Sequence, residues 1–541
     1  MKHADIIQTL DLEQKCALLS GGTVFDTRPL PGKNVPSITL SDGPNGVRKQ
    51  AGAADHLGLN PSVPATCFPT SATVANSWDP ALGEAVGEAM GEEAAAQEVS
   101  VLLGPGLNIK RSPLCGRNFE YFSEDPYLAG KMAAGYVRGI QKNGIAACPK
   151  HFAVNSQELR RMASDSIVDE RTLREIYLTG FEIVVKEAKP KTIMSSYNLI
   201  NGTYANENAH LLKDILRKDW GFEGAVVTDW GGSNDHALGV KNGSTLEMPC
   251  PGGDSIRELM KAVQGGKISE ADVDARLDEM LELVLSTHAA VEKAPRTFDA
   301  AAHHKLARRA AAESIVLLRN EGGILPLKPN EKLAVIGDFA ETPRYQGAGS
   351  SAVNALQVDT LLDSIKADDS GITFVGYASG FERQGAADAE KLEEAVALAK
   401  KADTVLLCLG LDELRESEGL DRSDMKLAEN QQQLLDAVAA VNPNVVVLLS
   451  AGAPVETPWA GQCRALVYGA LGGQAGAGAA ADILTGKLCP CGKLSQTWAK
   501  AHDDTPAKAN FGGEGRNVEY REGLYLSLIH ISEPTRRRGI S

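Results

Sequence analysis

The sequence predicts an α/β protein with two domains: a TIM-like (β/α) barrel, followed by an α/β sandwich with a mostly parallel sheet. Its 541 residues are too many for one compact hydrophobic core. In the first half, short β-rich runs alternate with helical patterns over roughly the 250 residues that a (β/α) barrel takes. In the second half, near-continuous apolar runs stand between helical patterns, as in a parallel sheet covered on both faces.

Each β-rich run of the first half is succeeded by polar or glycine-rich residues. Since the chemistry of a (β/α) barrel gathers at the carboxyl ends of its strands, these residues are expected at the active end. The runs, each with the residues after it, are 38–40 before Ser41–Pro44, 101–103 before Gly104–Gly106, 145–147 before Lys150 and His151, 193–194 before Tyr197, and 225–227 before Asp229.

The domain boundaries follow from the helical patterns. One over 271–285 closes the first half, and one over 301–318 opens the second. We expect a barrel-like catalytic domain at 1–290, a linker at 291–305 and an incomplete α/β sandwich at 306–526. The remainder, 527–541, has three consecutive arginines and no periodicity, and is interpreted as a non-native tail outside the fold. The apolar strands expected in the second domain are 334–336, 373–375, 405–407, 445–449 and 465–467.

The charge balance excludes several classes of partner. A formal charge of −15 and a pI near 5.3 disfavour nucleic acid and acidic membrane surfaces, whereas a small neutral substrate is indifferent to them. The N-terminus has no apolar signal region, which predicts a cytoplasmic protein, and the oligomeric state stays open. The nine cysteines are scattered, as expected of reduced thiols. Only Cys489 and Cys491 lie close together, and that step alone is a poor metal site.

Asp229 is the first candidate for chemistry. It follows an apolar run in Val-Val-Thr-Asp-Trp-Gly-Gly, and a carboxylate placed there, beside an indole and flexible glycines, can face the floor of a pocket. A turn aspartate that caps the next helix fits the same pattern.

Three basic residues also admit two interpretations. Lys150 and His151 point inward if the chain bends at the barrel rim, and otherwise they are a surface lysine and a core histidine. Arg117 lies in Gly-Arg-Asn-Phe-Glu-Tyr-Phe-Ser-Glu-Asp-Pro. Its guanidinium can fork onto vicinal hydroxyls or a carboxylate, or pair internally with a glutamate of the same segment.

Asp42, Glu418 and the glycine cluster 347–351 are weaker signals. Asp42 lies in a Ser-Asp-Gly-Pro turn, and Glu418 lies in an acidic loop that by itself indicates a solvated surface. The cluster Gly-Ala-Gly-Ser-Ser lacks the Gly-Lys-Ser/Thr ending of a phosphate-binding loop.

From residue 38 to 523 the chain resembles glycoside hydrolase family 3, a group rich in bacterial β-glucosidases. Ten ordered segments over nearly the whole chain are far more specific than any one motif. They are SDGPNGVR, GRNFEYFSEDP, KHFAVNSQE, MSSYN, GFEGAVVTDW, LEMP, GAGSS, SEGLDR, SAGAPVETPW and GKLSQTW.

The resemblance implies roles for particular residues. The aspartate that ends the Asp-Trp segment, Asp229, corresponds to the family's nucleophile. The glutamate before Gly-x-Asp-Arg, Glu418, corresponds to a general acid/base supplied by the second domain. Trp230 corresponds to a pocket wall, and Ser350 to a second-domain contact in a short segment. The residues that correspond to sugar-hydroxyl contacts are Asp42, Arg117, Lys150, His151, Arg161 and Tyr197.

The activity that the resemblance implies is retaining exo-hydrolysis of terminal β-D-glucosyl residues from β-glucosides and cello-oligosaccharides, without metal or organic cofactor. Such enzymes use two carboxyl groups roughly 5–5.5 Å apart. Lys150 and nearby arginines are expected to lower the pKa of the nucleophile. Glu418 is expected in a drier or more anionic setting that holds its proton. Asp42 favours glucose, because the corresponding family aspartate binds the outer hydroxyls of a terminal glucosyl unit.

Other functions stay open on the sequence alone. A β-xylosidase or broad aryl-β-glycosidase would have the same fold. A nucleotide- or phosphate-binding enzyme could use the glycine cluster 347–351, although no Walker or dinucleotide motif supports it. A truncated, inactive carbohydrate-binding chain is the third alternative, because family members continue past 520–523. The N-acetylglucosaminidase branch is disfavoured, because Lys-His-Phe is followed by Ala-Val and not Pro-Gly.

Overall fold

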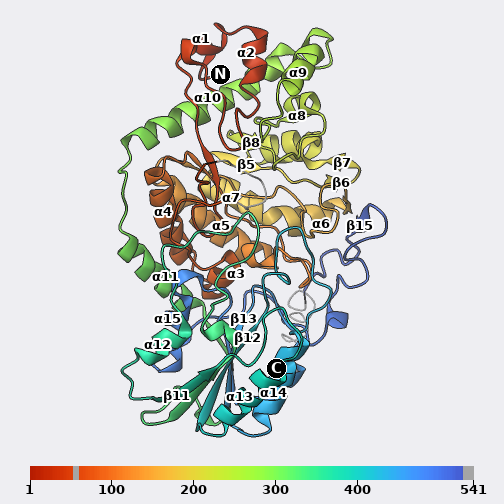
Figure 1. Ribbon diagram of the computed structural model, residues 1–541. Helices are drawn as coiled ribbons and strands as arrows, with labels where there is room; N and C mark the ends of the chain where they lie inside the picture. Colours follow the sequence, from red (N-terminus) through yellow and green to blue (C-terminus); the bar gives the residue numbers. More distant parts are fainter. Residues whose placement is uncertain (53–59, 528–541) are drawn as a thin grey trace, which may run out of the picture.

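A computed structural model describes residues 1–52 and 60–527, and confirms the predicted fold class. The barrel domain occupies the upper part of Figure 1 and the α/β domain the lower part. Apart from Ser527, the predicted tail 527–541 lies outside the described residues. Within the described residues, no helix is long and apolar enough to cross a membrane. All nine cysteines are free thiols, and six of them are buried.

The barrel is built from short, buried, parallel strands at the predicted places. Its first sheet has the order β1-β2-β3, and β5 pairs with β8. Single bridges, Phe152 to Ser195 and Val227 to Leu246, link these pieces into a curved wall. The strands are β1 (Leu40–Asp42), β2 (Val101–Leu103), β3 (Ala146–Ala147), β5 (Thr192–Met194) and β8 (Ala225–Val227).

Helices α4 (Pro80–Ala96) and α5 (Pro126–Gln141) pack closely against each other, and α5 also contacts β3. Each begins with an aspartate cap followed by proline, a combination suited to the first turn of a helix. At their contact, a Cβ on Gly139 would lie 2.1 Å from the backbone oxygen of Glu84, so the helices approach only because this residue is glycine.

The connection between the domains is shorter than the pattern predicts. Helix α10 (Glu270–Lys293) runs past the predicted end at 285, and α11 begins at Ala300, so residues 294–299 join them. The helix predicted over 301–318 is wrong at its end: α11 (Ala300–Ser314) stops and β9 (Val316–Asn320) follows. Residues 316–320 pair antiparallel with β14, and this long-range pairing overrides the local helical pattern.

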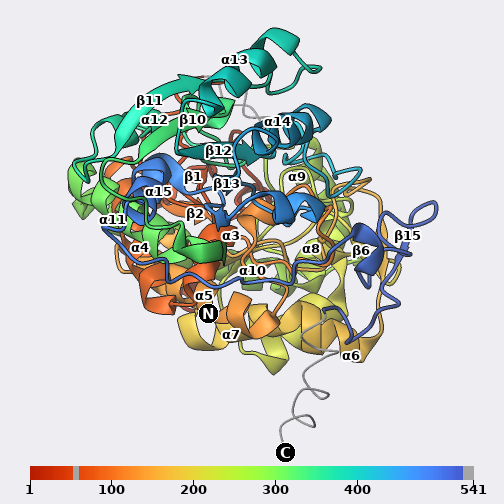
Figure 2. The same ribbon diagram turned by 90° about the horizontal axis from the view of Figure 1, so that it is seen from below.

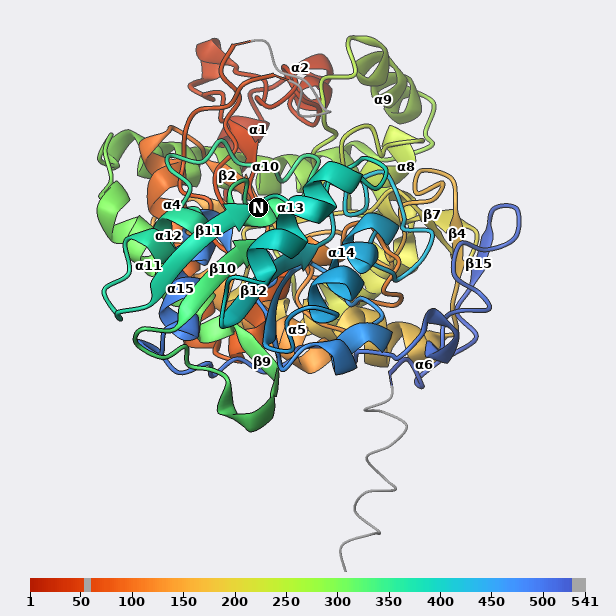
Figure 3. The same ribbon diagram turned by 60° about the horizontal axis from the view of Figure 1, so that its bottom comes forward.

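The second domain contains a six-stranded sheet in the order β11-β10-β12-β13-β14-β9, parallel except for β9. Helices α13 and α14 cover one face, and α11, α12 and α15 lie toward the other (Figures 2 and 3). The elements are β10 (Lys332–Ile336), β11 (Thr373–Ala378), β12 (Thr404–Gly410), β13 (Val445–Ser450), β14 (Ala465–Tyr468), α12 (Leu361–Lys366), α13 (Ala389–Ala399), α14 (Glu429–Ala439) and α15 (Gly476–Leu484).

Smaller elements complete the barrel domain. The N-terminus forms two short helices, which pack on α10. These smaller elements are α1 (Ala4–Ile7), α2 (Leu12–Ala17), α3 (Ser71–Val74), α6 (Glu170–Thr172), α8 (His236–Asn242), α9 (Asp254–Gln264), β4 (Asp165–Ile167), β6 (Leu199–Ile200), β7 (Thr203–Tyr204) and the π-helical turns Leu173–Leu178 and His210–Asp219.

The end of the described chain returns to the barrel domain. Strand β15 (Asn517–Glu519) pairs with β4, and is the end strand of a sheet with the order β15-β4-β6-β7 at the edge of the molecule (Figure 1). Next to it, Glu522 accepts hydrogen bonds from Arg111, and both side chains are almost fully buried. The Arg111 guanidinium also lies 3.8 Å from the centre of the Tyr520 ring. Residues 516–526, predicted as part of the second domain, therefore contact the first.

We expect Glu522→Ala to lower the free energy of unfolding by about 3–5 kcal/mol, because it leaves the Arg111 guanidinium buried without its carboxylate. Urea unfolding followed by circular dichroism measures the loss. Glu514→Ala is the control: this side chain is exposed on the same segment, and its removal should change stability by less than about 0.5 kcal/mol. Equal effects of the two substitutions would contradict the assignment of Arg111–Glu522 as the contact that holds this segment.

Candidate active site

Asp229 lies two residues after β8, at the carboxyl end of the barrel. Its Oδ1 accepts the backbone N–H of Trp230 at 2.8 Å. Its Oδ2 is buried without a hydrogen-bond partner, and lies 3.7 Å from Nε2 of His151. Because a buried carboxylate oxygen without a partner is rare, this atom is available to a ligand.

The pKa of Asp229 departs from the prediction. Burial raises the pKa of this carboxyl; Arg117, Arg161 and Lys150 lower it, and the charge of Glu418 raises it further. The three cations act in the predicted direction, but burial outweighs them, so the net shift is upward. The predicted effect of the cations on the pKa of Asp229 is confirmed, although it does not set the direction of the net shift.

Lys150 and His151 both lie inside the barrel mouth, since both side chains are almost fully buried. This excludes the alternative of a surface lysine. The carboxamide oxygen of Asn108 accepts the backbone N–H of His151 at 2.7 Å, and the Tyr121 hydroxyl lies 3.2 Å from its Nδ1. Burial, and then Arg117, Lys150 and Arg161, hold the pKa of His151 well below its usual value, so the imidazole is neutral.

Arg117 and Asp42 close two further sides of the site. Arg117 is fully buried and pairs with Glu120 of its own segment, as one interpretation predicted, while its Nη1 lies 3.7 Å from Oε1 of Glu418. Asp42 ends β1, and its Oδ2 lies 3.8 Å from Nη1 of Arg48. Burial raises the pKa of Asp42 to about 6, although Lys150 and Arg48 oppose that shift.

Glu418 reaches this site from the second domain, on the loop that follows β12 (Thr404–Gly410). Its Oε1 accepts Nη1 of Arg161 at 2.8 Å. Its Oε2 accepts the backbone N–H of Ser350 at 2.8 Å and the Ser350 hydroxyl at 2.5 Å. The second domain thus brings one carboxylate to the mouth of the barrel that holds another.

Glu418 is buried, as the predicted drier setting requires, but its neighbours are cationic and the expectation that it holds its proton was wrong. Burial by itself would raise the pKa of this carboxyl, but Arg117, Arg161 and the two donors of Ser350 hold it well below its usual range. In the unliganded chain Glu418 is therefore ionised. The physical reason is that the loop sets both carboxylate oxygens against donors, which stabilise the charged form.

Two aromatic residues form a wall. The Tyr197 hydroxyl donates to the backbone oxygen of Trp230 at 2.9 Å, and the Arg161 guanidinium lies 5.0 Å from the centre of the Tyr197 ring. The indole N–H of Trp230 donates to the backbone oxygen of Val24 at 2.8 Å, and its ring packs 5.2 Å from that of Phe25. These contacts fix both rings beside Asp229.

The glycine cluster 347–351 has a steric explanation. A Cβ on Gly347 would lie 2.1 Å from the Phe119 ring, and one on Gly349, whose φ is +117°, would lie 2.4 Å from Cβ of Glu418. The turn therefore needs glycine in order to bring Ser350 against Glu418. This removes the reason for interpreting the cluster as a phosphate cradle.

The site includes three residues that the sequence interpretation missed: Glu158, Asp421 and Gly116. Asp421 accepts the backbone N–H groups of Gly116 at 3.1 Å and of Glu158 at 3.0 Å. Glu158 accepts the N–H of Gly419 at 2.7 Å. The signal was present, because all three lie inside family-matching segments, but nothing in the sequence pairs them.

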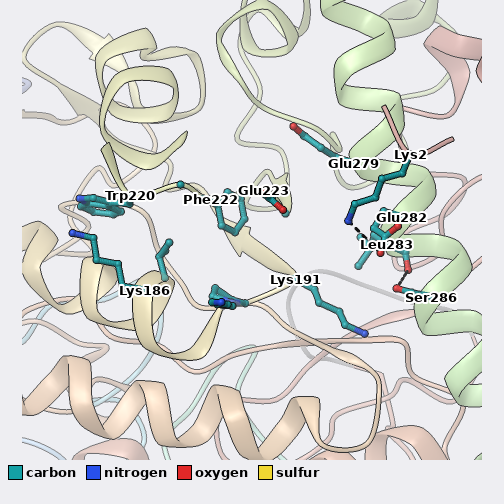
Figure 4. A pocket seen from close by; sticks show the side chains of 15 residues that line it. Lys2, Lys186, Lys191, Trp220, Phe222, Glu223, Glu279, Glu282, Leu283 and Ser286 are labelled. Atoms are coloured by element: carbon teal, nitrogen blue, oxygen red, sulfur yellow. Dashed lines mark hydrogen bonds and ion pairs between the residues drawn. The ribbon is translucent and has the colours of Figure 1, made fainter. Parts of the chain in front are cut away.

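A cavity of about 690 Å³ lies elsewhere, beside α10 (Figure 4). It is lined by Lys2, Lys191, Trp220 and Leu283 among others, and by none of the residues predicted for the site. Because Lys191 and Gly224 directly precede β5 and β8, this cavity is at the amino ends of the strands. It is therefore at the opposite end of the barrel from Asp229.

A carboxylate at the carboxyl end of a barrel strand, faced by a second carboxylate among cations and hydroxyl donors, defines the chain as a glycoside hydrolase. Residues 53–283 match the Glycosyl hydrolase family 3 N terminal domain, and residues 315–528 match the Glycosyl hydrolase family 3 C-terminal domain. The chain belongs to glycoside hydrolase family 3.

Named relatives and solved structures agree with this family. The chain is 46% identical over 524 residues to thermostable β-glucosidase B of Acetivibrio thermocellus, covering 96% of this chain and 69% of the relative. It is 44% identical over 532 residues to an exo-α-(1→6)-L-arabinopyranosidase of Bifidobacterium breve, covering 96% of this chain and 70% of that relative. The crystal structure of a family 3 β-glucosidase from Bifidobacterium adolescentis superimposes with a TM-score of 0.92 at 43% identity, covering 98% of this chain and 76% of that one. That of β-glucosidase 3B from Thermotoga neapolitana, in complex with glucose, gives 0.88 at 34% identity, covering 97% and 80%.

We expect Asp42→Asn to stabilise the chain at neutral pH. The pKa of Asp42 is about 6 in the fold against an ordinary 3.8, so ionising it costs the folded state free energy, fully above pH 6 and not at all below pH 3.8. The difference in unfolding free energy, variant minus parent, should therefore rise between pH 4 and pH 6, to about 2–3 kcal/mol at most. Urea titrations across this range measure it, and a flat difference would contradict the pKa.

Proposed function

We propose that the chain is a retaining, exo-acting β-glucosidase that releases terminal non-reducing β-D-glucosyl residues from β-glucosides and cello-oligosaccharides. The observation that carries the proposal is the pair of carboxylates, Asp229 and Glu418, which come from different domains and interact electrostatically in one buried site. The β-glucosidases among its relatives, including one solved with glucose, support the same substrate.

In the first step, Asp229 attacks the anomeric carbon through Oδ2, the oxygen without a hydrogen-bond partner. Glu418 gives its proton to the leaving oxygen, which produces a covalent glucosyl-enzyme. Lys150, Arg117 and Arg161 offset the cost of burying the attacking carboxylate, because each lowers its pKa. In the second step, Glu418 takes a proton from water, which attacks the same carbon and releases glucose with its configuration retained.

Glu418 must gain a proton before it can act as the acid. In the unliganded site Arg161 and Ser350 hold it ionised. A bound glycoside displaces water and offers its hydroxyls to these donors, so that their hold on Glu418 weakens and the pKa of Glu418 rises. Protonation is thereby coupled to occupancy of the pocket.

The remaining polar groups position the sugar ring. In this proposal Asp42, Lys150, Arg117, His151 and Tyr197 bind the hydroxyls of the ring, and their charged hydrogen bonds to vicinal hydroxyls hold the ring relative to Asp229. The resemblance assigns Asp42 to the outer hydroxyls of a terminal glucosyl unit, which favours attack at a chain end. Neutral His151 donates or accepts without adding charge beside the nucleophile.

A second candidate is favoured by one relative, the exo-α-(1→6)-L-arabinopyranosidase that is 44% identical. An α-L-arabinopyranoside has the ring configuration of a β-D-galactoside without its hydroxymethyl group, and a β-xyloside likewise lacks that group. Either ring could present its anomeric carbon to the same carboxylates. The contacts to the outer hydroxyls of the ring decide which of these glycosides is preferred. The same contacts decide whether the enzyme is instead a broad aryl-β-glycosidase.

The proposed substrate is tested by comparing the hydrolysis of p-nitrophenyl β-D-glucoside, β-D-xyloside and α-L-arabinopyranoside. We expect kcat/KM to be highest for the glucoside, and Asp229→Asn to lower it by at least about a thousandfold, because the variant lacks the nucleophile. The matched control is Asp235→Asn, which should retain activity. It removes another carboxylate from the segment that follows β8, the one that caps α8.

Other results of this comparison identify the alternatives. Faster turnover of the arabinopyranoside or the xyloside would replace the glucosidase by that specificity. Folded protein without any turnover, whose thermal midpoint nevertheless rises with added glucose, would indicate an inactive carbohydrate-binding chain.

The acid/base role of Glu418 is tested by the substitution Glu418→Ala. Without an acid, hydrolysis of glucosides with poor leaving groups should fall by a hundredfold or more (roughly 10²–10⁴), while 2,4-dinitrophenyl β-D-glucoside keeps its kcat/KM within about tenfold. Added azide should raise kcat for the activated substrate and yield β-glucosyl azide, detectable by NMR. Equal losses for all leaving groups, without an azide product, would remove Glu418 from the acid/base role.

A further inference from the structure

The loop that carries Glu418 is held against the barrel by close backbone packing and by hydrogen bonds. A Cβ on Gly116 would lie 1.7 Å from the backbone oxygen of Leu420, so the loop presses directly on the barrel domain. Asp421 accepts three barrel N–H groups there, those of Gly116, Glu158 and Leu159, the last at 2.8 Å. The direction of the Glu418 side chain therefore depends on a contact between domains.

Glu158 is the side chain at the centre of this contact, and it is fully buried. Its Oε2 accepts the N–H of Gly419, the residue after Glu418, at 2.7 Å, and Nη1 of Arg161 at 2.8 Å. The same Nη1 lies 2.8 Å from Oε1 of Glu418. The other carboxylate oxygen of Glu158, its Oε1, is buried without a hydrogen-bond partner. Glu158 thus contacts both the backbone beside Glu418 and the cation that binds the Glu418 carboxylate.

We propose that Glu158 is a positioning residue for Glu418: it anchors the backbone at Gly419 and shares Arg161 with the Glu418 carboxylate. The inference rests on the proposed function, because it presumes that Glu418 is the acid/base. Glu158 itself lies behind Arg161 and Gly419, outside the set of groups assigned to the sugar.

This arrangement has two physical consequences. Without Glu158, the N–H of Gly419 loses the acceptor that fixes the loop beside Glu418, and the loop is free to shift. A displacement of about 1 Å of a catalytic group costs on the order of a hundredfold in rate. In addition, the Glu158 carboxylate is the partner that holds Arg161 when Arg161 turns from Glu418 to the substrate. Without Glu158, Arg161 stays bound to Glu418 and opposes the protonation of Glu418.

The test uses two substrates that differ in their need for acid catalysis, cellobiose and 2,4-dinitrophenyl β-D-glucoside. For Glu158→Ala we expect kcat/KM for cellobiose to fall about a hundredfold, and that for the dinitrophenyl glucoside to change by less than about threefold. Glu158→Gln keeps an amide oxygen for the N–H of Gly419, and should recover part of the loss on cellobiose. Glu418→Gln, measured beside them, should show the same selectivity for the leaving group.

The control is Glu124→Gln. Glu124 is a buried carboxylate that also joins the domains, accepting the N–H and the hydroxyl of Thr497 at 2.7 and 2.6 Å, and these described hydrogen bonds do not involve Gly419 or Arg161. It should leave the ratio of the two kcat/KM values unchanged. A change in that ratio as large as that of Glu158→Ala would overturn the proposal, because any disturbance of the domain contact would then suffice.

The remaining outcomes separate the inference from the function. Suppose that Glu418→Gln is selective for the leaving group, but that Glu158→Ala lowers kcat/KM equally for both substrates or for neither. Glu158 is then not a positioning residue, and the proposed function stands. If Glu418→Gln is itself unselective, both proposals fail together. Should Glu158→Ala not fold, as judged by its thermal midpoint, the ratio measured for Glu158→Gln decides: a loss confined to cellobiose supports the proposal, and an unchanged ratio overturns it.

Discussion

The contact between the second domain and the carboxyl end of the barrel is the constraint on which the site depends. Asp229 follows β8 in the first domain and Glu418 follows β12 in the second, so neither domain alone holds both carboxylates. The contact is secured close to the site by Asp421 and Glu158, and farther away by the pairing of β15 with β4. A displacement between the domains would therefore separate the two carboxylates before it disturbed either core.

Within this contact the buried charges are balanced by neighbouring side chains of opposite sign. The carboxylates Asp42, Asp229, Glu158 and Glu418 face the cations Arg117, Lys150 and Arg161. Burial raises the pKa of carboxyls that have few direct donors, whereas Glu418, with donors on both oxygens, stays ionised. The unliganded site thus differs electrostatically from the reacting one, and Arg161 is the cation placed to change partners between them.

Much of the fold and the site could be predicted from local patterns and ordered motifs. The strands before Asp229 and Lys150 lie where the pattern put them, because short apolar runs that end in glycine or polar residues have few other structures open to them. The motifs named residues that the fold brings into contact from distant segments, as the Glu418–Arg161 and Glu418–Ser350 hydrogen bonds illustrate. The end of α11 was mispredicted, because residues 316–320 pair with a strand far along the chain. Glu158 was missed because its partners, Gly419 and Arg161, come from different domains.

The sequence by itself determined the fold class, the order of the strands along the chain and the identity of the residues that carry the family resemblance. These properties depend on local apolar patterns and on motifs that can be read along the chain. Only the tertiary structure decided which charges share a site, whether Lys150 points inward, and that the pKa of Glu418 is lowered and that of Asp229 raised. The reason is that burial and electrostatic interaction depend on distances in space, and these distances join residues that lie hundreds of positions apart.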